Sequence, residues 1–189
     1  MDYFTSDTHF HHANIIRYCN RPFSTVEEMN NVLIENINKK VKPDDTLYHL
    51  GDFAKFDVKG IREKINCKNI VLILGNHDNI KNIRRNASLF AGIHNLLQIK
   101  SCIGNGVITE IVLCHYAMRI WNKSHYGTWH LYGHSHGTLY DDPNSLSFDV
   151  GVDPCNYVPL SITEVKNKMN AKTYKPIDHH NNGNISEIS

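Results

Sequence analysis

Residue types that bind metal ions or move protons are concentrated in a few short stretches of this sequence. The densest runs from Gly75 to Asp78 and contains Asn76 and His77; it follows an aliphatic run that begins at Ile70. Such a run, ended by glycine, is typical of a buried parallel strand, and open α/β sheets place their sites at the loops after these strands. The loop offers an amide, an imidazole and a carboxylate in succession, so it has the groups to bind a metal ion and carry a proton.

Four other stretches place similar donors after strand-like residues. They follow predicted strands near residues 3–5, 46–50, 107–114 and 129–132, and their donors are Asp7, His9, Asp52, His115, His134 and His136. In an extended backbone, residues i and i+2 face the same side, so Asp7 and His9, like His134 and His136, are expected to reach one point in space. Each stretch alone also fits a plain role as a cap or turn.

Taken together, these donors supply oxygen and imidazole nitrogen and no thiolate. The set is Asp7, His9, Asp52, Asn76, His115, His134 and His136. It suits divalent manganese, iron or zinc at a reactive site and disfavours a structural zinc site. Seven ligands are too many for one catalytic ion, but they suit two ions about 3.5 to 4 Å apart, the arrangement that supports phosphoester hydrolysis. Asp52, with two carboxylate oxygens, is the natural bridge.

In order and spacing, the five stretches resemble the motifs of the calcineurin-like metallophosphoesterase superfamily. The resemblance extends to about Asp153. By that resemblance, one metal would be held by Asp7, His9, Asp52 and His136. The second would be held by Asp52, Asn76, His115 and His134. We therefore expect two divalent metal ions per chain, manganese before iron, zinc or nickel.

The same resemblance implies the fold and narrows the branch of the superfamily. The fold is an α/β β-sandwich of two mixed sheets flanked by α-helices, with the metal site at the strand ends. The stretch from Thr5 to Phe23, with Asn14, Arg17 and Arg21, looks like a small stand-alone bacterial or phage-type phosphoesterase. Position 11 departs from the pattern, because a histidine stands where we expect glycine, and this adds an imidazole beside the site.

The resemblance also implies catalytic and substrate-binding roles. A hydroxide bridging the two ions would attack phosphorus in line, and His77, held by Asp78, would protonate the leaving oxygen. His77 as a buried structural histidine is the alternative. Candidates for contact with the substrate are His11, His12, Asn14, Arg17 and Arg21. For the two arginines, a structural ion pair is equally compatible with the sequence.

The leading functional hypothesis is a phosphodiesterase for a nucleotide or nucleic-acid-like substrate. A phosphomonoesterase is the alternative, because both reactions use the same metal core. A metal-binding interaction module without catalytic activity is a third reading. An incomplete ligand set would mark that case, and all seven donors are present.

The sequence predicts the helices and strands that hold these donors in place. We expect helices over 13–19, 24–41, 58–65, 80–90 and 161–169, with capping boxes at Ser24–Glu27 and Ser161–Glu164. The strand ending in Asp52, the next helix and the strand before Gly75 form a β-α-β unit. Residues 93–103 and 107–114 are predicted to pair as a hairpin, and 116–128 to form a long loop.

The composition limits the class of protein. A chain of 189 residues fits one domain, placed over 1–170, followed by a polar tail over 171–189. With 20 Lys and Arg against 19 Asp and Glu, nothing indicates a general nucleic-acid or membrane-surface binder. The five cysteines lack C-x-x-C spacing, and no apolar run or signal segment stands out, so we expect a cytoplasmic protein. The oligomeric state is not predicted.

Overall fold

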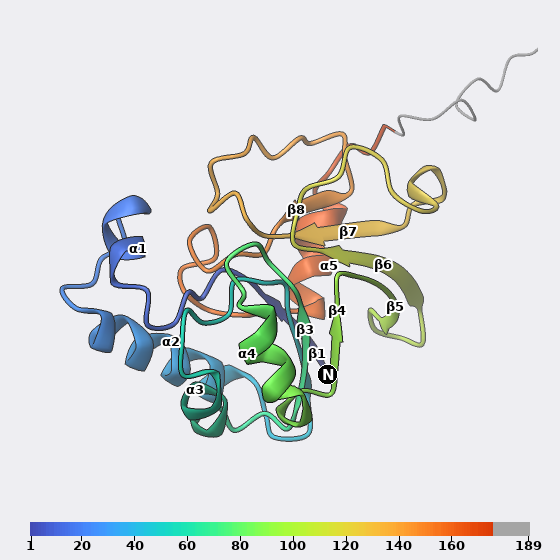
Figure 1. The fold of residues 1–189 in the computed structure, drawn as a ribbon. Coiled ribbons are helices and arrows are strands. Elements are labelled where there is room, and N and C mark those ends of the chain that lie inside the picture. Colours follow the sequence, from blue (N-terminus) through green and yellow to red (C-terminus); the bar gives the residue numbers. More distant parts are fainter. Residues whose placement is uncertain (176–189) are drawn as a thin grey trace, which may run out of the picture.

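The computed structural model describes residues 1–175, and its first sheet is built around the predicted β-α-β unit (Figure 1). The strand order is β4-β3-β2-β1-β9. The strands are β1 (Asp2–Thr5), β2 (Thr46–His49), β3 (Asn69–Ile73), β4 (Gly92–His94) and β9 (Leu160–Ser161). The first four are parallel and β9 is antiparallel to β1. Because β1, β2 and β3 are parallel neighbours, the donor-bearing loops that follow them leave from one edge.

The second sheet has the order β5-β6-β7-β8 and is also mixed. Its strands are β5 (Leu96–Cys102), β6 (Ile108–Cys114), β7 (Trp129–Tyr132) and β8 (Ser147–Asp149). The β5–β6 pair is the predicted hairpin, and β6, β7 and β8 run parallel, so the residues that follow them emerge together. Two mixed sheets flanked by helices confirm the predicted fold class.

Side-chain alternation along the strands divides the apolar residues between two cores. In β1, Tyr3 joins the core under the helices α2 (Val26–Lys40), α3 (Val58–Lys64) and α4 (Ile80–Arg85). Its neighbour Phe4 points the other way, into the core that the second sheet and α5 (Ile162–Asn170) complete. Successive strand residues face opposite sides, so a central strand buried on both faces is apolar throughout. The short α1 (Ala13–Tyr18) follows the first donor stretch.

The capping predictions are confirmed at one helix and shifted at another. Ser161 and Glu164 form the predicted capping box of α5. For α2 the cap is Thr25, whose hydroxyl accepts from the Glu28 N–H, one residue later than predicted. Both registers offer a hydroxyl followed three residues later by glutamate, so the sequence did not distinguish them.

Two predicted elements are interrupted. The strand expected over 93–103 is divided at Asn95, so that β4 belongs to the first sheet and β5 to the second. The helix expected over 80–90 ends at Arg85 and continues as a 3₁₀ turn over Ala87–Leu89. There, the Asn86 side chain donates to the Asn82 carbonyl, a local bond that competes with regular helix.

Two other predictions concern the ends and the class of the chain. The proposed domain boundary at residue 170 coincides with the end of α5, although the division into domain and tail stays a prediction. The tail prediction for 176–189 lies outside the described residues. Within residues 1–175, none of the helices has the length and apolar character needed to cross a bilayer.

Candidate metal centre

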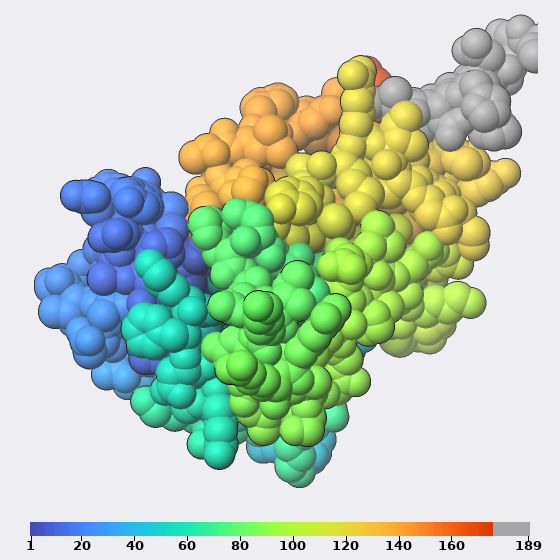
Figure 2. Space-filling model, viewed as in Figure 1, coloured from blue at the N-terminus to red at the C-terminus, as the bar shows by residue number. Residues whose placement is uncertain are grey.

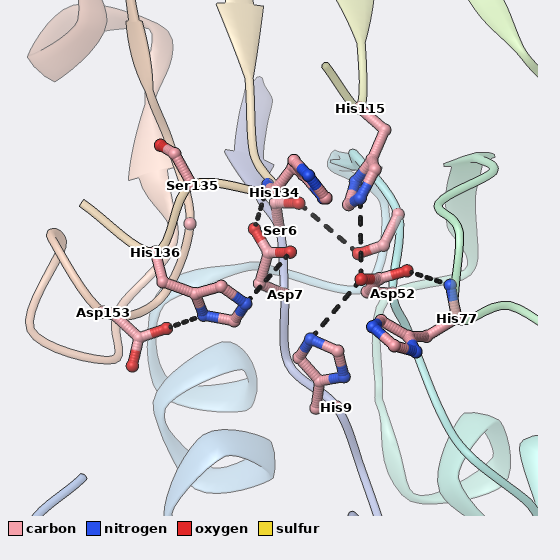
Figure 3. Close-up of polar contacts among 12 residues, drawn as sticks. Ser6, Asp7, His9, Asp52, His77, His115, His134, Ser135, His136 and Asp153 are labelled. Carbon is pink, nitrogen blue, oxygen red and sulfur yellow. Dashed lines mark hydrogen bonds and ion pairs between the residues drawn. The ribbon is translucent and has the colours of Figure 1, made fainter. Parts of the chain in front are cut away.

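The five donor stretches meet at the adjoining strand ends of the two sheets (Figure 3). The extended backbone that we predicted for Asp7 and His9 and for His134 and His136 is wrong, because these four donors and Asp52 lie in the left-handed region. The φ angles are 58° at Asp7, 49° at His9, 55° at Asp52, 66° at His134 and 48° at His136. Non-glycine residues seldom adopt this conformation, and strained backbone of this kind is concentrated at functional sites. The sharp turns bring the side chains together without the i, i+2 geometry of a strand.

The first cluster contains Asp7, His9 and His136. One ligand atom from each lies within 4.8 Å of the others. The Nδ1 of His136 lies 2.6 Å from the Asp153 carboxylate, so Nδ1 carries the proton and donates, which leaves the lone pair of Nε2 facing Asp7 Oδ1 at 3.9 Å. The His134 N–H donates to the other Asp7 oxygen at 2.9 Å. One oxygen of Asp7 is thus held and one is directed at the cluster.

The second cluster contains Asp52, His115 and His134. His115 Nδ1 lies 2.7 Å from the Leu50 carbonyl and donates to it, so the neutral ring presents a lone pair at Nε2. That nitrogen lies 3.1 Å from Asn76 Oδ1 and 3.5 Å from Asp52 Oδ2. The lone pairs of His115 Nε2, Asn76 Oδ1 and Asp52 Oδ2 therefore converge with no hydrogen between them. A cation would stabilise this arrangement.

Asp52 lies between the two clusters. Its Oδ2 is 3.4 Å from His9 Nε2 and 3.5 Å from His115 Nε2, while Oδ1 accepts from the His77 N–H at 2.8 Å. Figure 3 shows His9 and His115 approaching this carboxylate from different directions. One carboxylate therefore adjoins the donors of both clusters, which is the position a bridging ligand requires.

The electrostatics of the first cluster fit a divalent cation. Asp7 Oδ1 and His9 Nε2 are buried and have no hydrogen-bond partner within the described part of the chain. Burial, together with the Asp149 and Asp52 carboxylates, raises the pKa of Asp7 to about 8, and burial lowers the pKa of His9 to about 2. Unpartnered buried donors of this kind are costly unless a charge compensates them, and oxygen with imidazole suits manganese, iron or zinc. The residues present fit the implied metal ions.

Two glycines are required by the close approach of these loops. A Cβ at Gly133 would overlap the Ser6 hydroxyl and lie 2.5 Å from Asp7 Oδ2, and one at Gly75 would overlap the Asp52 carboxylate. Any side chain at either position would therefore displace a candidate ligand. This explains physically why glycine precedes both His134 and Asn76.

Two carboxylates that sequence reasoning missed support the centre from outside. Asp149 accepts from the Ser135 hydroxyl and from the Gly137 and Gly151 N–H groups, which fixes the loop that carries His134 and His136. Asp153 orients His136 in the way that metal-binding histidines are commonly held. Asp149 is the last residue of β8 and Asp153 follows that strand, so the rule that found the other donors, polar residues after a strand, would have found Asp153.

Arg21 forms the structural ion pair that the sequence left open. Its guanidinium makes a bidentate contact with Asp153 at 2.8 and 2.9 Å. The remaining N–H groups donate to the Asp7 and Thr8 carbonyls and to Met29 Sδ. All five donors of this buried side chain are therefore used within the protein, and none is left for a substrate.

Asp78 does not hold His77, which corrects the predicted pairing. Its buried carboxylate instead accepts from the N–H groups of Gly75, Asp52 and Phe53, each at 2.9 Å. These bonds join the loop after β3 to the loop after β2. The His77 ring is exposed and lies 5.4 Å from the His9 ring, centroid to centroid, so the alternative of a buried histidine is excluded. The catalytic assignment of His77 stays a prediction.

The other predicted substrate contacts lie at different distances from the clusters. His12 Nδ1 is 3.4 Å from His9 Nδ1, next to the first cluster. His11 is bonded to Asn30 and stacks on Phe56. Asn14 and Arg17 are exposed on α1. Contact of these four residues with a substrate stays a prediction.

A third group of possible ligands, Cys19 with His136 and Asp153, is less suited to a metal ion. Asp153 is already engaged by Arg21. Burial, with a smaller contribution from Asp153, raises the pKa of the Cys19 thiol to about 11, and only the thiolate binds metal well. This group therefore supports His136 and is not a separate site.

The buried His49 side chain should make the free energy of unfolding depend on pH in acid. Thr8 Oγ1 donates to the Phe53 carbonyl, so His49 Nε2 donates to Thr8 at 2.9 Å and the ring is neutral. Burial, with a smaller effect of His115, lowers its pKa to about 3. Below pH 6.5, His49 binds a proton in the unfolded chain but not in the folded chain. The contribution of neutral His49 to the free energy of unfolding is therefore complete above pH 6.5 and is lost as the pH falls towards 3.

We expect His49→Gln, which can still donate to Thr8, to remove that dependence. Urea unfolding in EDTA between pH 4 and 6 should show a slope of unfolding free energy against pH about 1.4 kcal/mol per unit smaller than wild type. EDTA removes the linkage of metal binding to protons. A slope equal to that of wild type would show that folding does not prevent His49 from binding a proton.

Comparison with known proteins identifies relatives of this chain. No family model matches it. The uncharacterised protein MJ1445 of Methanocaldococcus jannaschii is 38% identical over 173 residues, which cover 85% of this chain and 86% of that protein. The chain belongs to the MJ1445 family. The similarity between this chain and MJ1445 therefore extends over most of both proteins.

Two solved structures resemble the fold of this member of the MJ1445 family. The protein of unknown function AQ665 from Aquifex aeolicus is 26% identical, with a TM-score of 0.67, over 88% of this chain and 98% of that one. A conserved uncharacterised protein of Streptococcus pneumoniae, described as a predicted phosphoesterase, is 16% identical over 79% and 70% of the two chains. Its TM-score of 0.38 is too low to support an argument. The two mixed sheets and the meeting of all five motifs at their strand ends confirm the resemblance to the calcineurin-like superfamily.

Proposed function

We propose that this protein is a dinuclear-metal-dependent phosphoester hydrolase that acts on phosphodiesters of a nucleotide or nucleic-acid-like substrate. The position of Asp52 is the observation that carries the proposal. A single carboxylate oxygen faces His9 of the first cluster and His115 of the second. Paired cation sites that share a carboxylate are the arrangement that phosphoester hydrolysis uses.

The proposed ligands divide between the two clusters. The first ion would be held by Asp7, His9, Asp52 and His136. The second would be held by Asp52, Asn76, His115 and His134. When bound, the ions supply Lewis-acid chemistry, activating water and neutralising charge on the phosphoryl oxygens. Manganese is the proposed metal, before iron, zinc or nickel.

The protein's own groups have separate tasks in this proposal. His77, exposed beside His9, donates a proton to the leaving oxygen. Asp78 fixes the backbone of the His77 loop through three N–H groups. Asp153 and Leu50 hold the Nδ1 protons of His136 and His115, which keeps both Nε2 lone pairs directed inwards.

We favour diesters over monoesters because of the adjacent Asn76 and His77, whose side chains are both exposed beside the clusters. His77, as the proposed acid, would give the leaving alcohol the proton that it needs. A phosphomonoesterase is the second candidate. A metal-binding module without activity is the third, and both are outcomes of the following test.

The test is a substrate panel with the metal controlled. Purified protein is dialysed against EDTA, then assayed with bis(p-nitrophenyl) phosphate, p-nitrophenyl phosphate and cyclic nucleotides, with and without added Mn²⁺. We expect hydrolysis only with metal and a higher kcat/KM for diesters. Faster hydrolysis of the monoester would favour the phosphomonoesterase. Metal binding without hydrolysis of any substrate would favour the interaction module.

A further inference from the structure

The candidate metal centre opens into a cleft of about 740 Å³. His134 and His136, one from each cluster, line it together with Tyr18 at the end of α1 and Tyr116 just after β6. In Figure 2 the surface is hollowed between the blue α1 region and the orange segment that follows β7. Pockets for small ligands occupy roughly 300 to 1,000 Å³, so the cleft has room for a group the size of a nucleotide next to a phosphate at the clusters.

Two exposed aromatic rings are the main feature of this cleft. Tyr18 is 63% exposed and Tyr116 is 46% exposed, although large rings are usually buried. Tyr116 is held edge-on by His115 and His134, with centroids 5.0 and 4.8 Å away. Its position is therefore fixed by residues of the second cluster while much of the ring remains open to the cleft.

The surroundings of Tyr18 add positive charge. The Arg17 guanidinium lies 5.4 Å from the Tyr18 ring centroid. Within residues 1–175, no carboxylate forms an ion pair with Arg17, so its charge is uncompensated beside the cleft. Aromatic rings that stack on bases, combined with positive charge that attracts phosphate, are the features that bind single nucleotides and single strands.

We propose that Tyr18 and Tyr116 stack on a nucleobase next to the scissile phosphate, so that the substrate is a nucleotide phosphoester. This inference rests on the proposed function and specifies its substrate class. A phosphopeptide is the competing occupant. Its backbone would require a row of hydrogen-bonding groups along the cleft. Apart from His134 of the second cluster, the exposed side chains that line the cleft are Tyr18, Tyr116, Ala117, Thr138 and Leu139, and the Thr138 hydroxyl already donates to the Ser135 carbonyl.

The experiment compares substrates that share a leaving group and differ only in the base-bearing part. Thymidine 5′-(p-nitrophenyl phosphate) and methyl p-nitrophenyl phosphate both release p-nitrophenolate. We expect kcat/KM for the thymidine ester to be higher by roughly 5- to 140-fold, since stacking on a base is worth about 1 to 3 kcal/mol. The methyl ester tests the proposed function independently of the base.

Variants assign the preference to the two rings. Tyr116→Leu and Tyr18→Leu should each lower the ratio of the two kcat/KM values, while Tyr116→Phe, which keeps the ring, should retain it. Tyr126→Leu is the matched control, because Tyr126 is 77% exposed and lies on the loop after β6, outside this cleft. It should leave both rates unchanged.

A binding measurement gives a readout that does not depend on turnover. By calorimetry with Mn²⁺, thymidine 5′-monophosphate should bind more tightly than deoxyribose 5-phosphate, and Tyr116→Leu should reduce the difference. A nucleobase next to a phosphodiester can belong to a short nucleotide or to a single-stranded nucleic acid. Assays on a thymidine dinucleotide and on an oligothymidylate test these two sources. Cleavage of either that depends on Tyr116 supports the inference, and the faster of the two identifies the source.

Three results would overturn the inference. If both nitrophenyl esters are hydrolysed at equal kcat/KM, the phosphoesterase proposal stands and base stacking is wrong. If a phosphopeptide is the better substrate and the two sugar phosphates bind equally, the cleft serves a peptide. If neither ester is hydrolysed, the proposed function fails, and equal binding of the two sugar phosphates would then refute the stacking separately.

Discussion

An Asp52→Asn variant should lose metal at both clusters, with affinity lower by at least about 100-fold, because even changes outside the ligand set reach 10- to 100-fold. The substitution keeps the shape of the side chain, and its Oδ1 can still accept from the His77 N–H. What it removes is the negative charge facing His9 and His115. Hydrolysis should fall below detection as a consequence.

Elemental analysis after dialysis in Mn²⁺ measures this effect directly. Wild-type protein is expected to retain two ions per chain and the variant less than one. Asp57→Asn is the matched control, since Asp57 caps α3 away from the clusters and asparagine is also a good cap. A variant at position 52 that retains two ions per chain would contradict the bridging role.

The second large effect is expected for His77→Ala. This variant should keep both metal ions, since the ring is not among the proposed ligands, and lose roughly 10²-fold or more in kcat if His77 is the general acid. The loss should depend on the leaving group. An alkyl alcohol needs a proton to leave, whereas p-nitrophenolate needs almost none, so the nitrophenyl diester should be affected least.

Comparing the two leaving groups in one variant separates catalysis from folding. His125→Ala, on the loop after β6, serves as the histidine-to-alanine control and should behave like wild type with both substrates. An equal loss with alkyl and nitrophenyl diesters would show that His77 positions the substrate and does not supply a proton. Unchanged activity would exclude any role.

The sequence located most of the elements that carry the donors, for a local reason. The aliphatic run of β3, its ending at Gly75 and the β-α-β spacing from β2 are patterns of neighbouring residues, and β3 pairs with β2 in parallel as expected. The capping box at Ser161 is equally local. Errors occurred where two local solutions were equivalent, as at the cap of α2, or where one residue, Asn95, transfers the chain to another sheet.

The support of the donors was harder to predict, because it depends on contacts between distant residues. Arg21 and Asp153 are 132 positions apart, and nothing near either one identifies the other. The family resemblance implies that Asp78 holds His77, its neighbour in the sequence. The fold instead gives its carboxylate three backbone N–H groups, two of them on the loop after β2, a contact available only once β2 and β3 pair.

The sequence by itself determined which atoms are available, namely oxygen and imidazole nitrogen after five strand-like segments, because residue identity and strand periodicity are local properties. Only the tertiary structure decided how these atoms are used. It gave five of the seven donors a left-handed backbone, placed Asp52 between His9 and His115, and opened the cleft beside Tyr116. These features depend on how the faces of the two sheets pack against each other, and packing is a property of the whole chain.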